Sequence, residues 1–142
     1  MKEIFVRESN RLLDKLWYDE IDISAVSEIL ASDKYKILPE SIAIGQVYKV
    51  SYEGDLLIDG YEKGFLFIPK GSGIKEHEHK DDIEQYTLIS GELKLNGESM
   101  HVNRCMIGES HGIDPVSVNT AIKTLKISKK LIEENMNKKI LK

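Results

Sequence analysis

Apolar residues recur with helical spacing at the two ends of the chain. Near the start they stand at Leu12, Leu13, Leu16 and Trp17, and after a short break they recur at Val26, Ile29 and Leu30. Near the end they stand at Leu131, Ile132, Met136 and Ile140. Because residues three and four apart share one face of a helix, this pattern predicts a helical segment over 1–36 and a C-terminal helix over 129–142.

The middle of the chain, 37–128, has a different pattern. Its β-branched and aromatic runs are separated by glycines, which is typical of short strands joined by turns. Leu93 and Leu95 alternate with polar residues, and Asn96-Gly97 then predicts a tight hairpin turn. We therefore expect an all-β body with short flanking helices at the N- and C-termini.

Length and charge narrow the class of protein. A chain of 142 residues suits one domain with a core that needs no disulfides. The single cysteine, Cys105, excludes an intrachain disulfide and favours a reducing compartment. The sequence has no run of about 18 apolar residues, and Met1 to Asn10 carry charge throughout, so neither a membrane span nor a usual secretory signal is expected. These features predict a cytoplasmic protein.

The N-terminal segment also bears on partners, since two helices before a β body raise the question of a DNA-binding helix-turn-helix. Residues 1–31 hold four basic and seven acidic side chains, and the whole chain has a net charge of −4. A recognition helix needs basic side chains to meet phosphates, and anionic membranes also select basic surfaces. We therefore expect neither nucleic acid nor membrane as a partner, and expect the helices to pack on the β body or on a partner subunit.

A group of candidate metal ligands lies between Gly71 and His111. His77 and His79 are two apart, so in a strand both imidazoles project to the same side. Glu84 opens the next strand after a polar turn, and His111 on a later strand can supply a fourth ligand. Imidazole suits zinc, iron, nickel and copper, and a carboxylate extends the set to manganese. The alternative interpretation is that each histidine is a surface or hydrogen-bonded residue.

The spacing of these residues resembles the first motif of the cupin superfamily. The matching positions are Gly71, His77, His79, Glu84 and Gly91. The second cupin motif is matched in part, at Gly108 and His111. Met106 stands where the family has proline, and Pro115 stands where it has asparagine. The resemblance covers about 47–128.

This resemblance implies a jelly-roll β-barrel with one divalent metal ion, Fe, Mn, Zn or Ni, held by His77, His79, Glu84 and His111. It also implies a homodimer, which would cover the apolar set Ile4, Phe5, Leu12, Leu16 and Trp17. Cupins include dioxygenases, isomerases and lyases as well as non-catalytic proteins. Two hypotheses follow: a metal-dependent enzyme acting on a small polar molecule, or a module that binds or senses a small ligand or metal without turnover.

Two further residues are candidates for a role beside the metal. Tyr86 shares strand parity with Glu84, so its phenol is expected near the metal as an acid, a base or a hydrogen-bond donor. The arrangement resembles that of the cupin dimethylsulfoniopropionate lyases, and plain packing is the alternative. Lys75 is in phase with His77 by simple alternation, so its ammonium is a candidate for binding a substrate carboxylate, with a solvated lysine as the alternative.

Overall fold

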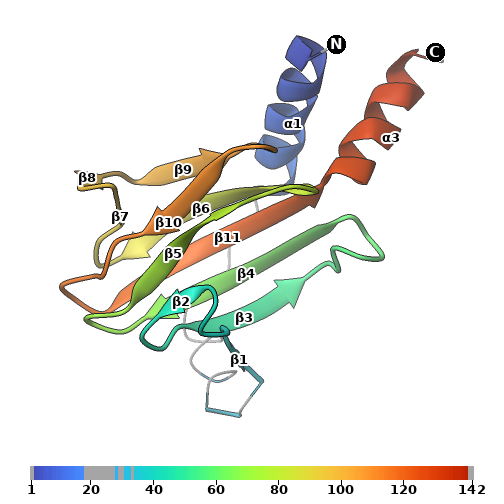
Figure 1. The fold of residues 1–142 in the computed structure, drawn as a ribbon. Helices are drawn as coiled ribbons and strands as arrows, with labels where there is room; N and C mark the ends of the chain where they lie inside the picture. The colour runs from blue at the N-terminus through green and yellow to red at the C-terminus, as the bar shows by residue number, and fades with distance from the viewer. Residues whose placement is uncertain (1, 18–27, 29–30, 33, 141–142) are drawn as a thin grey trace.

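The computed structural model describes residues 2–17, 28, 31–32 and 34–140. Helix α1 (Lys2–Trp17) begins the chain and helix α3 (Lys129–Ile140) ends it, in agreement with the apolar periodicity at both ends (Figure 1). The second short helix expected around Val26, Ile29 and Leu30 lies outside the described residues. Among the described residues, no helix is long and apolar enough to cross a membrane.

The body between the helices consists of antiparallel strands. One sheet has six strands in the order β1 (Lys36–Ile37), β3 (Tyr48–Glu53), β4 (Tyr61–Ile68), β11 (Thr120–Ser128), β6 (Asp82–Ser90), β9 (Val102–Cys105). A second sheet has the order β10 (Ser110–Ile113), β5 (Gly73–Glu78), β2 (Ala43–Ile44). A hairpin is formed by β7 (Lys94–Leu95) and β8 (Glu98–Ser99).

The two larger sheets face each other across the main core (Figure 1). The antiparallel body with flanking helices is confirmed. The described strands form three separate hydrogen-bonded sheets, however, and no single closed sheet, so the expected jelly-roll barrel is confirmed only in part. The core between the sheets is apolar and includes Val47, Ile68, Ile113 and Ile122, each at most 1 % exposed. Removing such side chains from water is the main stabilising contribution of this layer.

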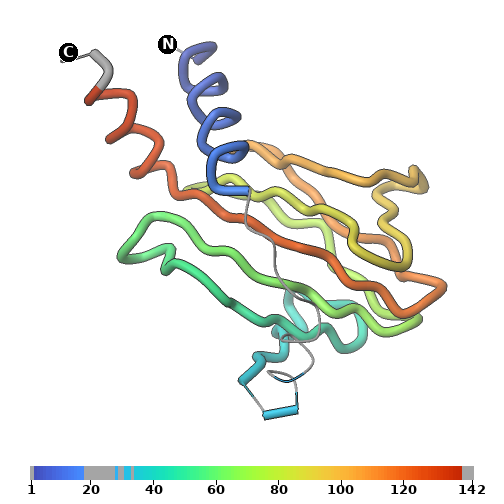
Figure 2. Tube along the Cα trace, turned by 180° about the vertical axis from the view of Figure 1, so that it is seen from behind, coloured from blue at the N-terminus to red at the C-terminus, as the bar shows by residue number. Residues whose placement is uncertain are grey.

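Both helices pack against the other side of the six-stranded sheet at one end of β11. They stand side by side at one end of the molecule, as the two opposite views show (Figures 1 and 2). Leu12 and Leu13 of α1 pack with Leu125 and Ile127 of β11 and with Ile132 of α3. The chain itself therefore buries part of the apolar set that a homodimer was expected to cover, whereas Ile4 stays 45 % exposed.

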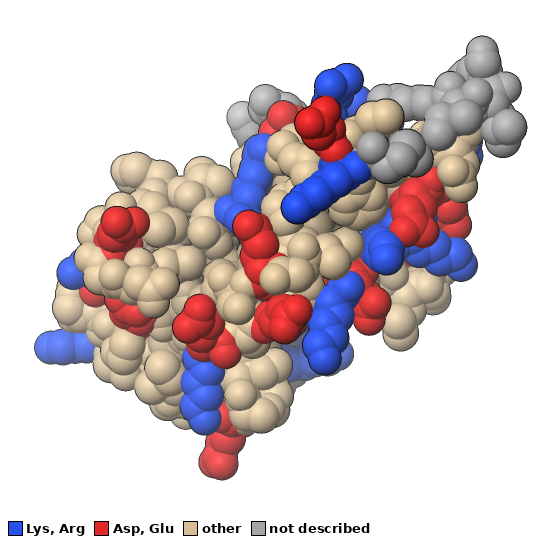
Figure 3. Space-filling view, turned by 45° about the horizontal axis from the view of Figure 1, so that its top comes forward, with Lys and Arg blue, Asp and Glu red and all other residues tan. Residues whose placement is uncertain are grey.

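The hairpin turn agrees with the sequence. Asn96 and Gly97 join β7 to β8 with φ angles of 52° and 81°. Positive φ at both central residues is the property of the type I′ turn, whose twist matches that of the strands it joins. On the face shown in Figure 3, lysine and arginine side chains are interspersed with aspartate and glutamate rather than gathered in one basic area.

Candidate metal centre

Three strands bring the four predicted metal ligands together. His77 lies in β5, opposite His111 of the neighbouring strand β10. His79 follows the end of β5, and its backbone stays tied to the chain before β10 through bonds with Glu109 and Gly108. Glu84 comes from β6 in the facing sheet. The site therefore lies between the two sheets, and each sheet contributes ligands.

The ligand atoms converge closely. One ligand atom from each of His77, His79, Glu84 and His111 lies within 4.8 Å of the others. The Nε2 atoms of His79 and His111 are 3.0 Å apart, and Glu84 Oε1 lies 3.4 Å and 3.1 Å from them. His79, Glu84 and His111 are buried, whereas His77 is partly exposed. This cluster could hold one metal ion.

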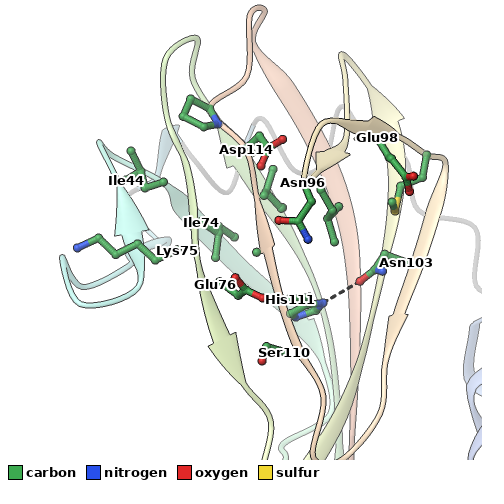
Figure 4. A pocket seen from close by; sticks show the side chains of 15 residues that line it. Ile44, Ile74, Lys75, Glu76, Asn96, Glu98, Asn103, Ser110, His111 and Asp114 are labelled. Carbon is green, nitrogen blue, oxygen red and sulfur yellow. Dashed lines mark hydrogen bonds between the residues drawn. The ribbon is translucent and has the colours of Figure 1, made fainter.

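The outer nitrogens of all three imidazoles are occupied by oxygen acceptors. His77 Nδ1 bonds to the Lys75 carbonyl at 2.9 Å, and His79 Nδ1 bonds to Asp82 Oδ1 at 2.5 Å. His111 Nδ1 bonds to Asn103 Oδ1 at 2.8 Å, which is the dashed line in Figure 4. An oxygen that accepts from Nδ1–H fixes the tautomer in which Nε2 carries the lone pair. The three rings are therefore oriented as metal ligands.

Asp82 and Asn103 were not predicted from the sequence. Asp82 follows His79 by three residues, so a carboxylate close to a ligand histidine was a signal that could have found it. Asn103 carries no such signal, because it meets His111 only through the pairing of β9 with β6 opposite Tyr86.

The electrostatics of the cluster follow from these partners. Burial acts to lower the pKa of His79, but the hydrogen bonds and charges of Asp82 and Glu84 outweigh it and raise the pKa to about 9. Burial dominates at His111, whose outer partner is a neutral amide, and its pKa is lowered. Burial acts to raise the pKa of Glu84, but the two histidines and Lys126 hold it well below its usual value. Glu84 is thus a carboxylate, the form that binds a cation.

The donor set fits a divalent transition metal. Imidazole nitrogen and carboxylate oxygen suit zinc, iron, nickel and manganese. Nε2 of His79, Nε2 of His111 and Oε1 of Glu84 lie close enough together for one cation to contact all three, in place of the proton that they share without it. Four protein ligands leave open positions on an octahedral ion, and an open position is what a catalytic site requires.

Tyr86 lies where strand parity places it. It is 1 % exposed, lines the cavity of the cluster and stacks on the His111 ring at 4.3 Å between centroids. Burial, followed by the charge of Glu84, raises the pKa of the phenol well above its usual value. Tyr86 is therefore protonated near neutral pH and has a proton to donate. Its role in chemistry stays a prediction, and the stacking is also what the packing interpretation expects.

A β-bulge changes the surroundings of Lys75. His111 pairs with His77 and Ile113 pairs with Ile74. Between these two pairs β5 therefore has one residue more than β10, which is a β-bulge. Simple alternation therefore fails here, and buried Ile74 reaches the cavity of the cluster. Lys75 is exposed, and its ammonium donates to the carbonyl of Glu40 at 2.8 Å. Its role in binding a substrate stays a prediction.

Lys75 lines a second hollow on the other side of His111. This hollow has a volume of about 400 Å³ and is bordered by polar side chains such as Glu76, Asn96 and Asp114 (Figure 4). The cavity of the cluster itself is smaller, about 150 Å³. Two lysines line the smaller cavity, Lys49 and Lys126. The sequence analysis missed both, although a lysine between the apolar residues Leu125 and Ile127 of β11 was a signal for Lys126.

Two other reactive side chains lie outside the cluster. Burial raises the pKa of the Cys105 thiol to about 12, and nearby carboxylates act in the same direction. A thiol with so high a pKa is a poor nucleophile. His101 is exposed and does not join the cluster of His77, His79, Glu84 and His111.

Comparisons with known proteins agree on the fold. No protein-family model and no curated protein sequence matches the chain. Among solved structures, a predicted oxalate decarboxylase from Thermotoga maritima has a TM-score of 0.57 and 19 % identity, over 68 % of this chain and 95 % of that one. An acetylacetone dioxygenase from Acinetobacter johnsonii has a TM-score of 0.55 and 16 % identity, over 78 % and 72 % of the two chains.

A third solved structure carries the family name itself. A cupin-like protein from Thermotoga maritima has a TM-score of 0.55 and 9 % identity, over 70 % of this chain and 81 % of that one. The chain therefore has the cupin fold, as the spacing of the first motif implied. At these identities the likeness concerns the fold, and the chemistry has to be argued from the site.

Proposed function

We propose that this protein is a metal-dependent enzyme of the dioxygenase, isomerase or lyase type that acts on a small polar molecule. The observation that carries the proposal is the occupation of all three histidine Nδ1 atoms, which leaves Nε2 of His77, His79 and His111 as the nitrogens available beside Glu84. A divalent ion bound there would supply a Lewis acid or an oxygen-activating centre.

The chain's own residues support catalysis in three ways. Asp82 and Asn103 hold the rings of His79 and His111 in place. The apolar side chains along one side of the cavity lower the local dielectric constant, which strengthens electrostatic interactions inside. Tyr86, fixed by its stack on His111, would donate a proton or a hydrogen bond to a substrate oxygen.

The proposal is tested by turnover. Protein loaded with one of the candidate metals is incubated with panels of organic acids, sugars, phenols and thiols, and loss of each compound is followed by NMR. Metal-stripped protein serves as the control. We expect turnover with the loaded protein alone. Binding of one compound without turnover would contradict the enzyme and support the alternative, a non-catalytic binding or sensing module.

The role of the Tyr86 hydroxyl in turnover is tested with the same assay. Tyr86→Phe keeps the ring and its stack and removes only the hydroxyl. Turnover is expected to fall roughly 10²- to 10⁴-fold, the usual effect of losing a positioned acid. Metal content should not change. A metal-loaded variant with unchanged turnover would leave Tyr86 as a packing residue.

The proposal includes a homodimer, as the resemblance to cupins implies. The partly covered apolar side chains of α1, with Ile4 at 45 % exposure, support an interface that includes this helix. Sedimentation at micromolar concentration measures the mass. A clean 16.2 kDa species would contradict the dimer.

A further inference from the structure

The cavity of the metal cluster has two unlike walls. One wall is apolar and is formed by Leu38, Ile42, Leu66 and Ile74. The other carries the cluster and charged side chains. A volume of about 150 Å³ accommodates a molecule about the size of benzene. A ligand that fits is therefore small, with a short apolar part and a polar end.

Charged side chains of alternating sign cross the polar wall from strand to strand. Lys49 of β3 pairs with Glu62 of β4 at 2.6 Å. Lys126 of β11 lies opposite Glu62 on one side and opposite Glu84 on the other. The side chains of Lys49 and Lys126 are only 21 % and 28 % exposed, so both charges are held largely inside the molecule.

Lys126 has donor capacity left for a ligand. Its ammonium lies 3.8 Å from Glu84 Oε2, which is longer than a hydrogen bond. An ammonium has three N–H donors and no acceptor, so its natural additional partner is an anionic oxygen. The cavity it lines is the space from which such an oxygen would approach.

The charge balance of the loaded site also favours an anionic ligand. A divalent ion and the two ammonium groups of Lys49 and Lys126 face three carboxylates, those of Glu62, Asp82 and Glu84. One net positive charge remains when all are ionised. Uncompensated charge in a largely buried site is costly, so a ligand with one negative charge would stabilise the loaded site.

We infer that the cavity binds a small aliphatic monocarboxylate, with its carboxylate on Lys126 and Lys49 and its hydrocarbon part against Leu66 and Ile74. This inference rests on the metal centre of the proposed function and names the substrate class of that site. A 2-hydroxy acid is a suitable member of this class, because its hydroxyl oxygen lies next to the carboxylate and is available to the ion.

The test compares 2-hydroxybutyrate with its neutral amide, which has the same shape and lacks the charge. Binding of each to zinc-loaded protein is measured by calorimetry, since zinc adds no redox chemistry. The acid should bind roughly ten- to a hundredfold more tightly than the amide, the scale of a charge-assisted hydrogen bond. Lys126→Met should bring the acid to the affinity of the amide, while zinc content stays unchanged.

Two further variants complete the test. Lys94→Met changes a partly exposed lysine outside the cavity and should leave the affinity for the acid unchanged. Lys49→Met should weaken acid binding, and it replaces Lys126→Met if that variant does not fold. Equal affinity for acid and amide in the wild-type protein would overturn the inference. So would wild-type affinity for the acid in both cavity variants.

Whether the protein binds zinc at all is measured separately from its affinity for the acid. Zinc content is measured in every sample before calorimetry. Protein that takes up no zinc would overturn the proposed function. The acid and the amide are then compared on the metal-free protein, in which the ammonium groups of Lys126 and Lys49 still line the cavity. Preference for the acid there supports the lysine site, and equal affinities overturn it.

Discussion

Strands β6 and β11 carry two different sets of side chains on their two faces. On the face toward the three-stranded sheet, Glu84 and Tyr86 of β6 lie beside Lys126 and Thr124 of β11. On the face toward the helices, Ile83 and Ile127 are 0 % exposed and pack in a purely apolar cluster with α1 and α3. The two faces are formed by alternate residues of each strand, since neighbours in a strand point to opposite sides.

The difference shows how one pair of strands can serve two purposes. The apolar cluster beneath the helices contributes burial of side chains that have no polar groups, so it stabilises the strands. The inner face carries buried charges, which stabilise little unless a ligand or an ion completes them. Changes to apolar side chains on the outer face should therefore affect stability alone, and changes to the charged side chains on the inner face should affect mainly binding.

The largest expected effect of this separation is on stability. Leu125→Ala removes a 0 % exposed side chain from the outer face of β11. The cavity and the lost burial should lower the free energy of unfolding by about 2–5 kcal/mol, measured in urea. Zinc bound per folded chain should stay at the wild-type value. A variant of wild-type stability, or one that folds but loses zinc, would break the separation of the two faces.

A smaller effect is expected at the residue that orients His79. Asp82→Asn removes the carboxylate that accepts from His79 Nδ1. The affinity for zinc should fall roughly 10- to 100-fold, the usual cost of losing such a partner. Competition with a coloured chelator measures it. The neighbouring change Asp81→Asn is the control, since Asp81 is exposed, and equal losses in both variants would argue against the role of Asp82.

The smallest effect is expected at Lys123, which lies on β11 three residues before Lys126 and on the opposite face. Its ammonium lies 4.1 Å from the centre of the Trp17 ring and also donates to the Trp17 carbonyl. Lys123→Met should cost about 0.5–1 kcal/mol of stability through the lost cation–π contact. It should leave the binding of zinc and of 2-hydroxybutyrate unchanged. Weaker binding of either would show that the two faces are coupled.

The sequence predicted this site well where local alternation holds. His77 and His79 point to one space, and Glu84 with Tyr86 shares the inner face of β6, because period two fixes both pairs. The hairpin at Asn96-Gly97 follows from turn chemistry. These features depend on residues close together in the chain.

Prediction failed where distant strands decide the outcome. The bulge in β5 appears only when its pairing with β10 is known, so the expected phase of Lys75 with His77 does not hold. Lys49 and Lys126 reach the cavity through the pairing of β3, β4 and β11. Likewise Asn103 meets His111 only across strands. The spacing of residues along the sequence does not show which distant strands pair.

The central claim is that His77, His79, Glu84 and His111 hold one metal ion. It is tested most directly by elemental analysis of protein dialysed against zinc, with His79→Ala and His101→Ala beside the wild type. We predict one zinc per chain in the wild type and in His101→Ala, whose changed histidine lies outside the cluster. His79→Ala should hold far less. Wild-type protein without zinc, or His79→Ala at wild-type occupancy, would contradict the account.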